Sequence, residues 1–351
     1  MSLDEAREFV RSFRFPGDLQ QAIDSSSMVK LERVKDLFYK CGLEITPNSS
    51  PRISECLEKV KVRLRIPENV VKAFIYASPE IQAQCFSSAE SECVIRVSSG
   101  LISLMTEKEL MFVLGHELGH FLFSHGGKHN QDDEVAYFRS SHAQEISADR
   151  VGLVACGALD DAIRAQIKTV SGLGSDHLSF DTNSFIGQLE KISEGGSWVD
   201  SASTHPPMVL RARALLWFSL SQFFGSRIAN DGLPLEKVDS RVMADLARDR
   251  ERANRAAMIA ARKDLVLWKI AQRIVQKGEF TKVAQAGVKT VLGEELFVKL
   301  RNFLGELSVE ESNEIVAQRL EAVIEDWRRA DLGNLESEIE SIELQIKELN
   351  I

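Results

Sequence analysis

The sequence predicts an α+β fold, mainly helical, with a small antiparallel β-sheet early in the chain and a helical C-terminal bundle. Apolar residues recur at helical spacing through most of the 351 residues. Between residues 70 and 97, three short runs instead have the length and composition of strands. From residue 235 onward the chain has high charge and little proline, which is typical of packed helices. Helices that flank one small sheet indicate the α+β class.

The first 65 residues are expected to be helical, because they carry two apolar stripes at helical spacing. A polar loop over residues 46–51, with a proline at each end of its core, separates the stripes. The first stripe is formed by Leu31, Val34, Leu37 and Phe38, and the second by Leu57, Val60 and Leu64.

The expected sheet contains residues 70–76, 82–86 and 93–97. Ser78 and Pro79 end the first strand, and a polar turn over residues 87–91 joins the other two. The short turn predicts that the second and third strands form an antiparallel hairpin.

A helix over residues 110–125 is predicted next, with the sequence LMFVLGHELGHFLFSH. Thr106 followed three residues later by Glu109 is a capping box, and no proline interrupts the apolar run behind it. On a helix, His116 and His120 lie one turn apart and present two imidazoles to one metal ion. Glu117 lies beside that ion, where a general base takes a proton from a metal-bound water. The alternative is a buried helix whose histidines are satisfied by the core.

A catalytic zinc site requires a third protein ligand from elsewhere in the chain. The most informative pair is Glu145 and Asp149, four residues apart on a predicted helix, where one carboxylate would bind metal and the other would orient a ligand histidine. Small Ala148 and Gly152 would let this helix pack closely on the first. The candidates for the third ligand are His125, His129, His142, Glu145, Asp149, His177 and His205.

Composition excludes several other classes of protein. A net charge of −9 argues against a nucleic-acid partner. The most apolar stretches carry charged residues, so no membrane-spanning helix is predicted, and the N-terminus lacks the apolar core of a signal peptide. Five cysteines, an odd number without a C-x-x-C pair, predict free thiols in the reducing cytoplasm.

The segment from about Leu57 to Arg213 resembles the gluzincin metallopeptidases typified by the CAAX prenyl protease and the heat-shock protease HtpX. Four pieces carry the resemblance in order: VSSGLISLMTEKELMFVLGHELGH, then His125, then EISADRVG from Glu145, then THPPMVLRAR from Thr204. The membrane helices of the two named types are absent from this sequence, which favours a soluble, minimal branch.

The resemblance implies a zincin-like metallopeptidase core with one zinc ion per chain. It implies that His116, His120 and Glu145 bind the zinc, that Glu117 is the base, and that Asp149 supports a ligand from behind. Where the family tends to carry Asn-Ala in a substrate-binding strand, this chain has Gln82 and Ala83.

Four regions are expected on these grounds. Residues 1–56 form an N-terminal helical region, residues 57–225 the zinc metallopeptidase domain, residues 226–330 a helical bundle, and residues 331–351 a C-terminal amphipathic helix. In that last helix, a stripe with three- and four-residue spacing either packs on its own bundle or joins two chains in a homodimer. The stripe consists of Leu332, Leu335, Ile339, Ile342, Ile346 and Leu349.

The predicted function is a zinc-dependent endopeptidase that acts on protein or peptide substrates. His205, in a stiff loop before Pro206 and Pro207, is predicted to donate to the oxyanion of the transition state. The competing role for His205 is to occupy the fourth zinc position and displace water. The competing function is a non-catalytic, zinc-containing scaffold whose helical C-terminal half binds a protein partner.

Overall fold

The computed structural model describes residues 2–18, 27–88, 92–125, 134–178, 181–188, 205–225, 232–329 and 332–349. The chain divides into two compact units. The first falls within residues 1–192 and 202–248, and the second within residues 193–201 and 249–351. The four regions expected from the sequence remain a prediction about how the chain is organised.

The first unit begins with three helices, and the two predicted apolar stripes lie on the second and third of them. Helix α1 starts at a capping box in which Ser2 accepts from the Glu5 amide and the Glu5 side chain accepts from the Ser2 amide. Pro51 stands in the first turn of α3, where its missing N–H costs nothing. The helices are α1 (Leu3–Arg11), α2 (Ser27–Cys41) and α3 (Pro51–Arg63).

The α+β class is confirmed, but the sheet is mixed rather than wholly antiparallel. Its order is β1-β2-β4-β3, with β2 parallel to β4 and the other two pairs antiparallel. The hairpin of β3 and β4 is present as predicted, whereas the two-residue β1 was not predicted. The strands are β1 (Leu43–Glu44), β2 (Val71–Tyr76), β3 (Ala83–Ser88) and β4 (Glu92–Ser98).

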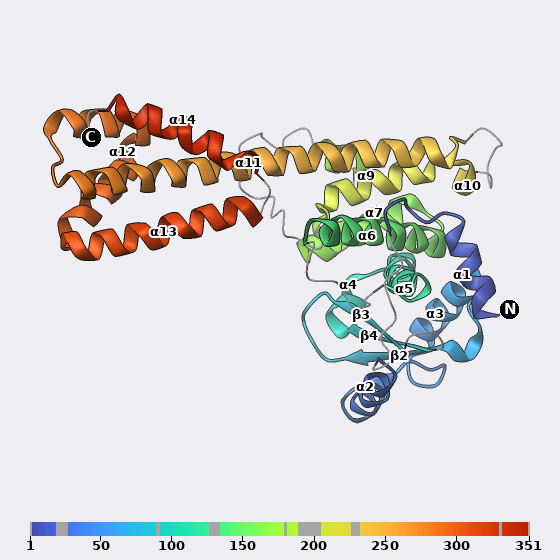
Figure 1. The fold of residues 1–351 in the computed structure, drawn as a ribbon. Coiled ribbons are helices and arrows are strands. Elements are labelled where there is room, and N and C mark those ends of the chain that lie inside the picture. The colour runs from blue at the N-terminus through green and yellow to red at the C-terminus, as the bar shows by residue number, and fades with distance from the viewer. Residues whose placement is uncertain are drawn as a thin grey trace. The chain divides into compact units, whose positions relative to one another are not determined.

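Helices cover both faces of this sheet (Figure 1). On one face α2 packs through Leu31 and Phe38 against Phe74 and Val94. On the other face lies the main core, in which β4 contributes Ile95 and further apolar residues opposite the helix α5. The short α4 (Ser99–Leu104) connects β4 to α5 (Glu107–Leu122).

Helix α6 (Glu134–Cys156) packs against α5 with glycines at the crossing. A Cβ atom at Gly115 would lie 2.4 Å from the Ala155 Cβ, and one at Gly152 would lie 2.8 Å from the Phe112 carbonyl oxygen. The expectation that small residues permit a close approach is therefore confirmed at Gly152. The remaining helices of the first unit are α7 (Leu159–Ser171), α8 (Thr182–Ile186), α9 (Met208–Ser219) and α10 (Gln222–Gly225).

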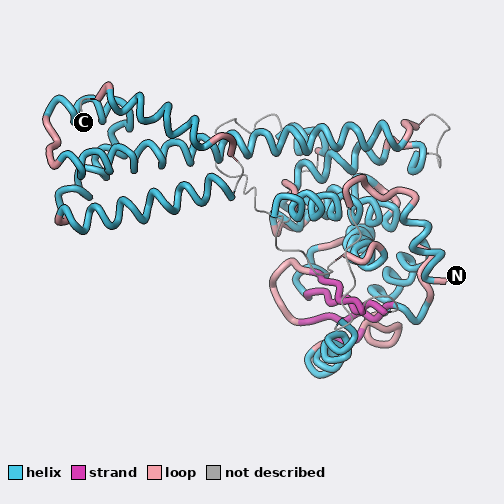
Figure 2. The backbone as a smooth tube through the Cα atoms, viewed as in Figure 1, coloured by secondary structure: helices cyan, strands magenta, loops and turns pink. Residues whose placement is uncertain are grey.

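The second unit is helical in its described part (Figure 2), as predicted for the C-terminal bundle. Helix α11 (Leu235–Lys277) begins in the first unit and ends in the second. Ile342 and Ile346 are almost fully buried in the core of the second unit, so the C-terminal stripe packs on its own bundle. The other helices are α12 (Lys282–Glu306), α13 (Val309–Arg329) and α14 (Leu335–Lys347).

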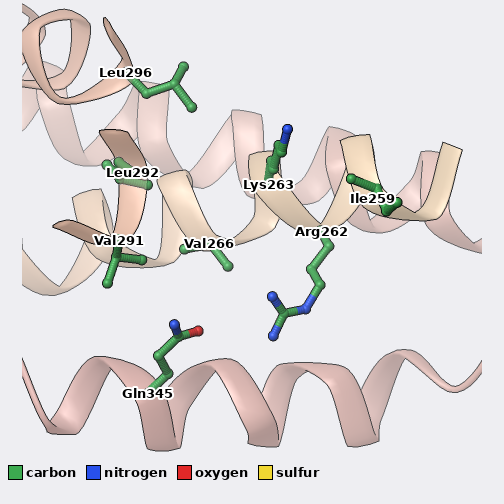
Figure 3. Close-up of a pocket in the computed structure, with 8 residues that line it drawn as sticks. All are labelled: Ile259, Arg262, Lys263, Val266, Val291, Leu292, Leu296 and Gln345. Atoms are coloured by element: carbon green, nitrogen blue, oxygen red, sulfur yellow. The ribbon is translucent and has the colours of Figure 1, made fainter. Parts of the chain in front are cut away.

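A pocket of about 310 Å³ lies among α11, α12 and α14 in the second unit (Figure 3). Its walls include Val266 and Leu292, and the Arg262 side chain, which lines it, pairs with Glu338. Among the helices described, none has both the length and the apolar content that a membrane crossing requires.

Candidate metal centre

The helix that carries the H-E-x-x-H motif begins after the predicted capping box at Thr106, and it ends at Leu122 rather than at His125. The Thr106 hydroxyl accepts from the Glu109 amide, and Oε2 of Glu109 accepts from the Thr106 amide at 2.7 Å. The Nζ atom of Lys168 lies 2.7 Å from the same carboxylate oxygen, and both side chains are almost completely buried. This buried ion pair fixes the first turn of α5 against α7.

Three side chains from two helices meet at one point. The Nε2 atoms of His116 and His120 are 3.1 Å apart. Oxygen atoms of Glu145, from α6, lie 3.6 Å from the His116 Nε2 and 3.4 Å from the His120 Nε2. One ligand atom from each residue falls within 4.8 Å of the others, and among the residues described these form the cluster able to hold a metal ion.

The spacing of these atoms fits a tetrahedral zinc site. Zinc–ligand bonds of about 2.0–2.2 Å place tetrahedral ligand atoms about 3.3–3.6 Å apart. The two imidazole nitrogens are 3.1 Å apart, and the nearest Glu145 oxygen is 3.6 Å from one (Oε2) and 3.4 Å from the other (Oε1), which is close to this range. The donor set of two imidazoles and one carboxylate also matches catalytic zinc sites, which leave the fourth position to water or substrate.

Asp149 lies one helical turn beyond Glu145 and contacts the back of the first histidine. Its Oδ1 is 3.0 Å from Nδ1 of His116, which leaves the His116 Nε2 facing the cluster. Gln166 donates to the Asp149 Oδ2 at 3.1 Å. Burial would raise the pKa of Asp149, but the Arg211 guanidinium and His116 hold it below its usual value. The carboxylate is therefore ionised and able to orient His116.

Arg211 from α9 is a residue of this site that sequence reasoning did not identify. Its Nη1 lies 2.9 Å from Oε2 of Glu145, and its Nη2 and Nε lie 2.6 and 2.8 Å from the two oxygens of Asp149. Burial would raise the pKa of Glu145, but Arg211 above all holds it well below the usual range. An arginine within the apolar sequence of α9 was the available signal, because a buried arginine requires a charged partner.

His125 and Asp18 contact the back of the second histidine. The His125 Nδ1 lies 2.8 Å from the His120 Nδ1, on the side of the ring away from the cluster. The His125 Nε2 lies 3.0 Å from Oδ1 of Asp18. Burial, although opposed by Asp18, lowers the pKa of His125 to about 4. His125 was a candidate third ligand, and the structure instead places it behind His120, outside the three-residue cluster; Asp18 had no sequence signal.

Glu117 follows His116 on α5 and is half-buried beside the cluster. Its charge acts on the groups around it. Burial disfavours the charged form of His120, but Glu145 and then Glu117 raise its pKa. A contact with Cys93, burial and the charge of Glu117 raise the pKa of Cys85 on β3 well above its usual value. Glu117 is therefore close enough to both His120 and Cys85 for its charge to act on them.

His205 is the other predicted site residue that reaches the cluster. Its Nδ1 lies 3.1 Å from Oε1 of Glu145, and 62% of its side-chain surface is exposed. The hydrogen bond to Glu145 raises the pKa of His205 despite partial burial. His142 and His177 are not in the cluster, and His129 lies outside the described residues.

Gln82 and Ala83 lie at the start of β3. The Gln82 carbonyl oxygen and amide contact Ser98, and its side-chain oxygen accepts from the Tyr76 hydroxyl at 3.1 Å. Ala83 pairs with Val97 in the sheet register. Strand β3 packs on α5, and its other edge has no partner among the strands described.

Part of the chain is similar to known metallopeptidase sequences. Residues 47–132 match the model of peptidase family M48. The chain is 28% identical over 156 residues to the metalloprotease YcaL of Escherichia coli, covering 40% of this chain and 58% of that protein. It is 31% identical over 77 residues to a protease HtpX homolog of Streptococcus equi subsp. zooepidemicus, covering 22% of this chain and 25% of that protein.

The chain thus spans less than two thirds of the length of these relatives. The match nevertheless contains the whole H-E-x-x-H helix, and the structure adds Glu145, which lies beyond the matched residues, to the same cluster. Residues 47–132, which include this helix, are thus similar to peptidase family M48.

Proposed function

We propose that this protein is a zinc-dependent endopeptidase that holds one zinc ion between α5 and α6. The observation that carries the proposal is the convergence of the His116, His120 and Glu145 ligand atoms within 4.8 Å, with Glu117 adjacent on α5. Zinc held there would supply a Lewis acid and would lower the pKa of its bound water to about 7 in the best cases.

Glu117 is the general base in this proposal. Its position next to a ligand histidine on the same helix places its carboxylate beside the metal rather than on it. It takes the proton of the attacking water and passes it to the leaving amine. Arg211 and Asp149 do not touch the substrate; they hold Glu145 and His116 in place.

Strand β3 supports the substrate part of the proposal. It is an edge strand that packs on the helix carrying the motif, so an extended peptide that pairs with it would run past the cluster. Backbone pairing holds a peptide in register without dictating its sequence. Gln82 already bonds Tyr76 through its side chain and Ser98 through its backbone, so we assign it the role of holding the start of β3 in place and assign Ala83 the role of pairing with substrate through its backbone.

His205 is proposed as a donor to the oxyanion that forms when water attacks the scissile carbonyl. Its contact with Glu145 shows that the ring reaches the edge of the cluster, and its exposure leaves it accessible to substrate. Loss of one such donor typically lowers turnover about 100- to 1,000-fold. The competing role, in which His205 occupies the fourth metal position, uses the same proximity and predicts the opposite effect on activity.

The proposed compartment is the cytoplasm. All five cysteines are free in the structure, and the Sγ atoms of Cys85 and Cys93 lie only 2.9 Å apart. In a compartment that forms disulfides, thiols this close would pair, so the redox state of Cys85 and Cys93 reports the compartment. Thiol titration of protein isolated without reductant tests this: five free thiols support the cytoplasm, and three contradict it.

One experiment tests the function. Metal content is measured by inductively coupled plasma analysis, and casein cleavage is followed with and without a chelator and after zinc is restored. We expect one zinc per chain and cleavage that depends on it. Zinc without cleavage would favour the non-catalytic scaffold, and absence of zinc from protein reconstituted with the metal would refute both readings.

A further inference from the structure

A buried chain of three side chains runs from the N-terminal segment to a proposed zinc ligand. Oδ1 and Oδ2 of Asp18 lie 3.0 and 3.1 Å from the His125 Nε2. The His125 Nδ1 lies 2.8 Å from the His120 Nδ1. The Asp18 side chain has no exposed surface and that of His125 has 3%, so water does not compete for these contacts.

The chemistry of the groups determines where the protons lie. An ionised carboxylate only accepts hydrogen bonds, so the His125 Nε2 must carry a proton and donate it to Asp18. The Nδ1 of a neutral His125 is then an acceptor, and the proton shared with His120 belongs to the His120 Nδ1. That tautomer leaves the Nε2 of His120, which lies 3.1 Å from the His116 Nε2, with its lone pair facing the cluster.

We propose that Asp18 is a positioning residue of the metal site: through His125 it holds His120 in the tautomer whose Nε2 binds metal. This inference rests on the proposed function, because it takes the cluster to be a zinc site. His125 donating to His120 instead would place a proton on the His120 Nε2 and block its coordination.

Two backbone features hold this chain of contacts in place. Ser124 adopts a left-handed conformation, with φ of 58°, and the His125 amide donates to the His120 carbonyl oxygen at 2.8 Å. This turn folds His125 back beneath the end of α5. The Asp18 segment is held by the Phe15 amide, which donates to Oγ of Ser147 on α6 at 3.1 Å.

A carboxylate also lies behind His116, and it contacts the ring without an intervening residue. The His116 Nδ1 contacts Oδ1 of Asp149 directly at 3.0 Å. Each proposed ligand histidine thus has a buried carboxylate behind it, Asp149 on α6 for His116 and Asp18 for His120. A carboxylate behind a ligand histidine fixes the ring and its tautomer, and its loss typically lowers metal affinity about 10- to 100-fold.

The test compares zinc affinities of full-length variants in competition with a chromophoric chelator. His125→Leu and His125→Asn form a matched pair of similar size, and only asparagine offers an oxygen where the His125 Nδ1 accepts. We expect about a 10- to 100-fold loss of affinity for His125→Leu and for Asp18→Asn, and a smaller loss for His125→Asn. His177→Phe, at an exposed histidine outside the cluster, should leave affinity unchanged.

A second measurement starts from the wild-type protein, so its main result does not depend on how well the variants fold. Long-range nitrogen–proton NMR of wild-type protein labelled at histidine nitrogen reports the tautomer of each ring. We expect the Nδ1–H form at His120 with and without zinc, and a rise of the Nε2–H form in metal-free Asp18→Asn.

The outcomes separate the two proposals. Wild-type protein that binds no zinc would refute the metal site itself. Wild-type protein that binds zinc while His125→Leu and Asp18→Asn bind it equally well would overturn the role of Asp18 and leave the site standing. Equal losses for His125→Leu and His125→Asn, or a predominant Nε2–H form at His120 in the wild type, would also overturn it.

Discussion

Nη1 of Arg211 lies 2.9 Å from Oε2 of Glu145, so a buried cation contacts the carboxylate proposed as the third zinc ligand. The same guanidinium forms two hydrogen bonds to Asp149. Without metal, Arg211 is the principal positive charge that neutralises these two buried acids, since the histidines are cationic only when protonated. When zinc is bound, Glu145 has two cations beside it.

Arg211→Met should therefore destabilise the metal-free protein more than the zinc-bound protein. Removal of one partner from a buried ion pair typically costs about 3–5 kcal/mol. Zinc would restore part of the lost neutralisation, so the increase in Tm on zinc addition should be larger in Arg211→Met than in the wild type. Calorimetry with and without zinc measures the difference.

Arg213→Met is the matched control on the same helix. Arg213 pairs with Asp245 at 2.9 Å but keeps 31% of its side chain exposed. Its loss should cost at most about 1 kcal/mol and leave the zinc-induced increase in Tm unchanged. Equal effects of the two substitutions would show that Arg211 acts only as an ordinary packing residue.

Glu145→Ala and Glu117→Ala should separate metal binding from chemistry. Glu145→Ala removes one of three ligand atoms and should lose zinc, whereas Glu117→Ala should keep zinc and lose turnover on casein. Loss of a general base typically lowers turnover about 100- to 10,000-fold. Metal analysis of both variants decides the assignment, and full zinc occupancy in Glu145→Ala would refute Glu145 as a ligand.

His205→Ala tests the role of the exposed histidine at the edge of the cluster. If His205 donates to the oxyanion, turnover should fall about 100- to 1,000-fold at unchanged zinc content. His205→Phe should behave in the same way, because it also removes the donor. Turnover at or above the wild-type level on an unstructured protein would instead favour occupation of the fourth metal position.

Gly115→Ala should weaken zinc binding without touching a ligand. The added methyl group would lie 2.4 Å from the Ala155 Cβ, so α5 and α6 must move apart. Overpacking of this kind costs about 1–3 kcal/mol, and it would shift Glu145 relative to the two histidines. Gly174→Ala is the control, because a Cβ there meets no atom within 4 Å. Chelator competition should show lower zinc affinity in the first variant alone.

Truncation after residue 330 tests whether the C-terminal stripe joins two chains in a homodimer, which is one of its two predicted roles. Because Ile342 and Ile346 are buried in the second unit, removal of α14 should lower thermal stability by exposing that core. The oligomeric state, measured by light scattering, should not change. A change from dimer to monomer would show that the helix joins two chains.

The sequence predicts most of the motif helix and of the metal cluster because their signals are local. A capping box starts α5, and four-residue spacings place His116 over His120 and Asp149 over Glu145. The parallel pairing of β2 with β4 could not be predicted in this way. The intervening β3 occupies the edge, and the partner of a strand is chosen by long-range packing rather than by its own sequence.

The sequence analysis did not predict Arg211 or Asp18 as site residues, for two different reasons. Arg211 lies in an apolar helix, so a buried charged partner was foreseeable although its identity was not. Asp18 lies in an irregular segment that precedes the family match, and only the tertiary fold brings it to His125. No periodicity or spacing in the sequence connects these two residues.

The position of β3 at the edge of the sheet also bears on self-association. Among the strands described, none pairs with the outer edge of β3, and such an edge accepts any extended backbone, including the strand of a second copy of this chain. A protein that aligns substrates in this way is open to competition from extended segments that pair with β3 without placing a bond at the cluster. Unfolded copies of this chain would therefore compete with substrate for the edge of β3.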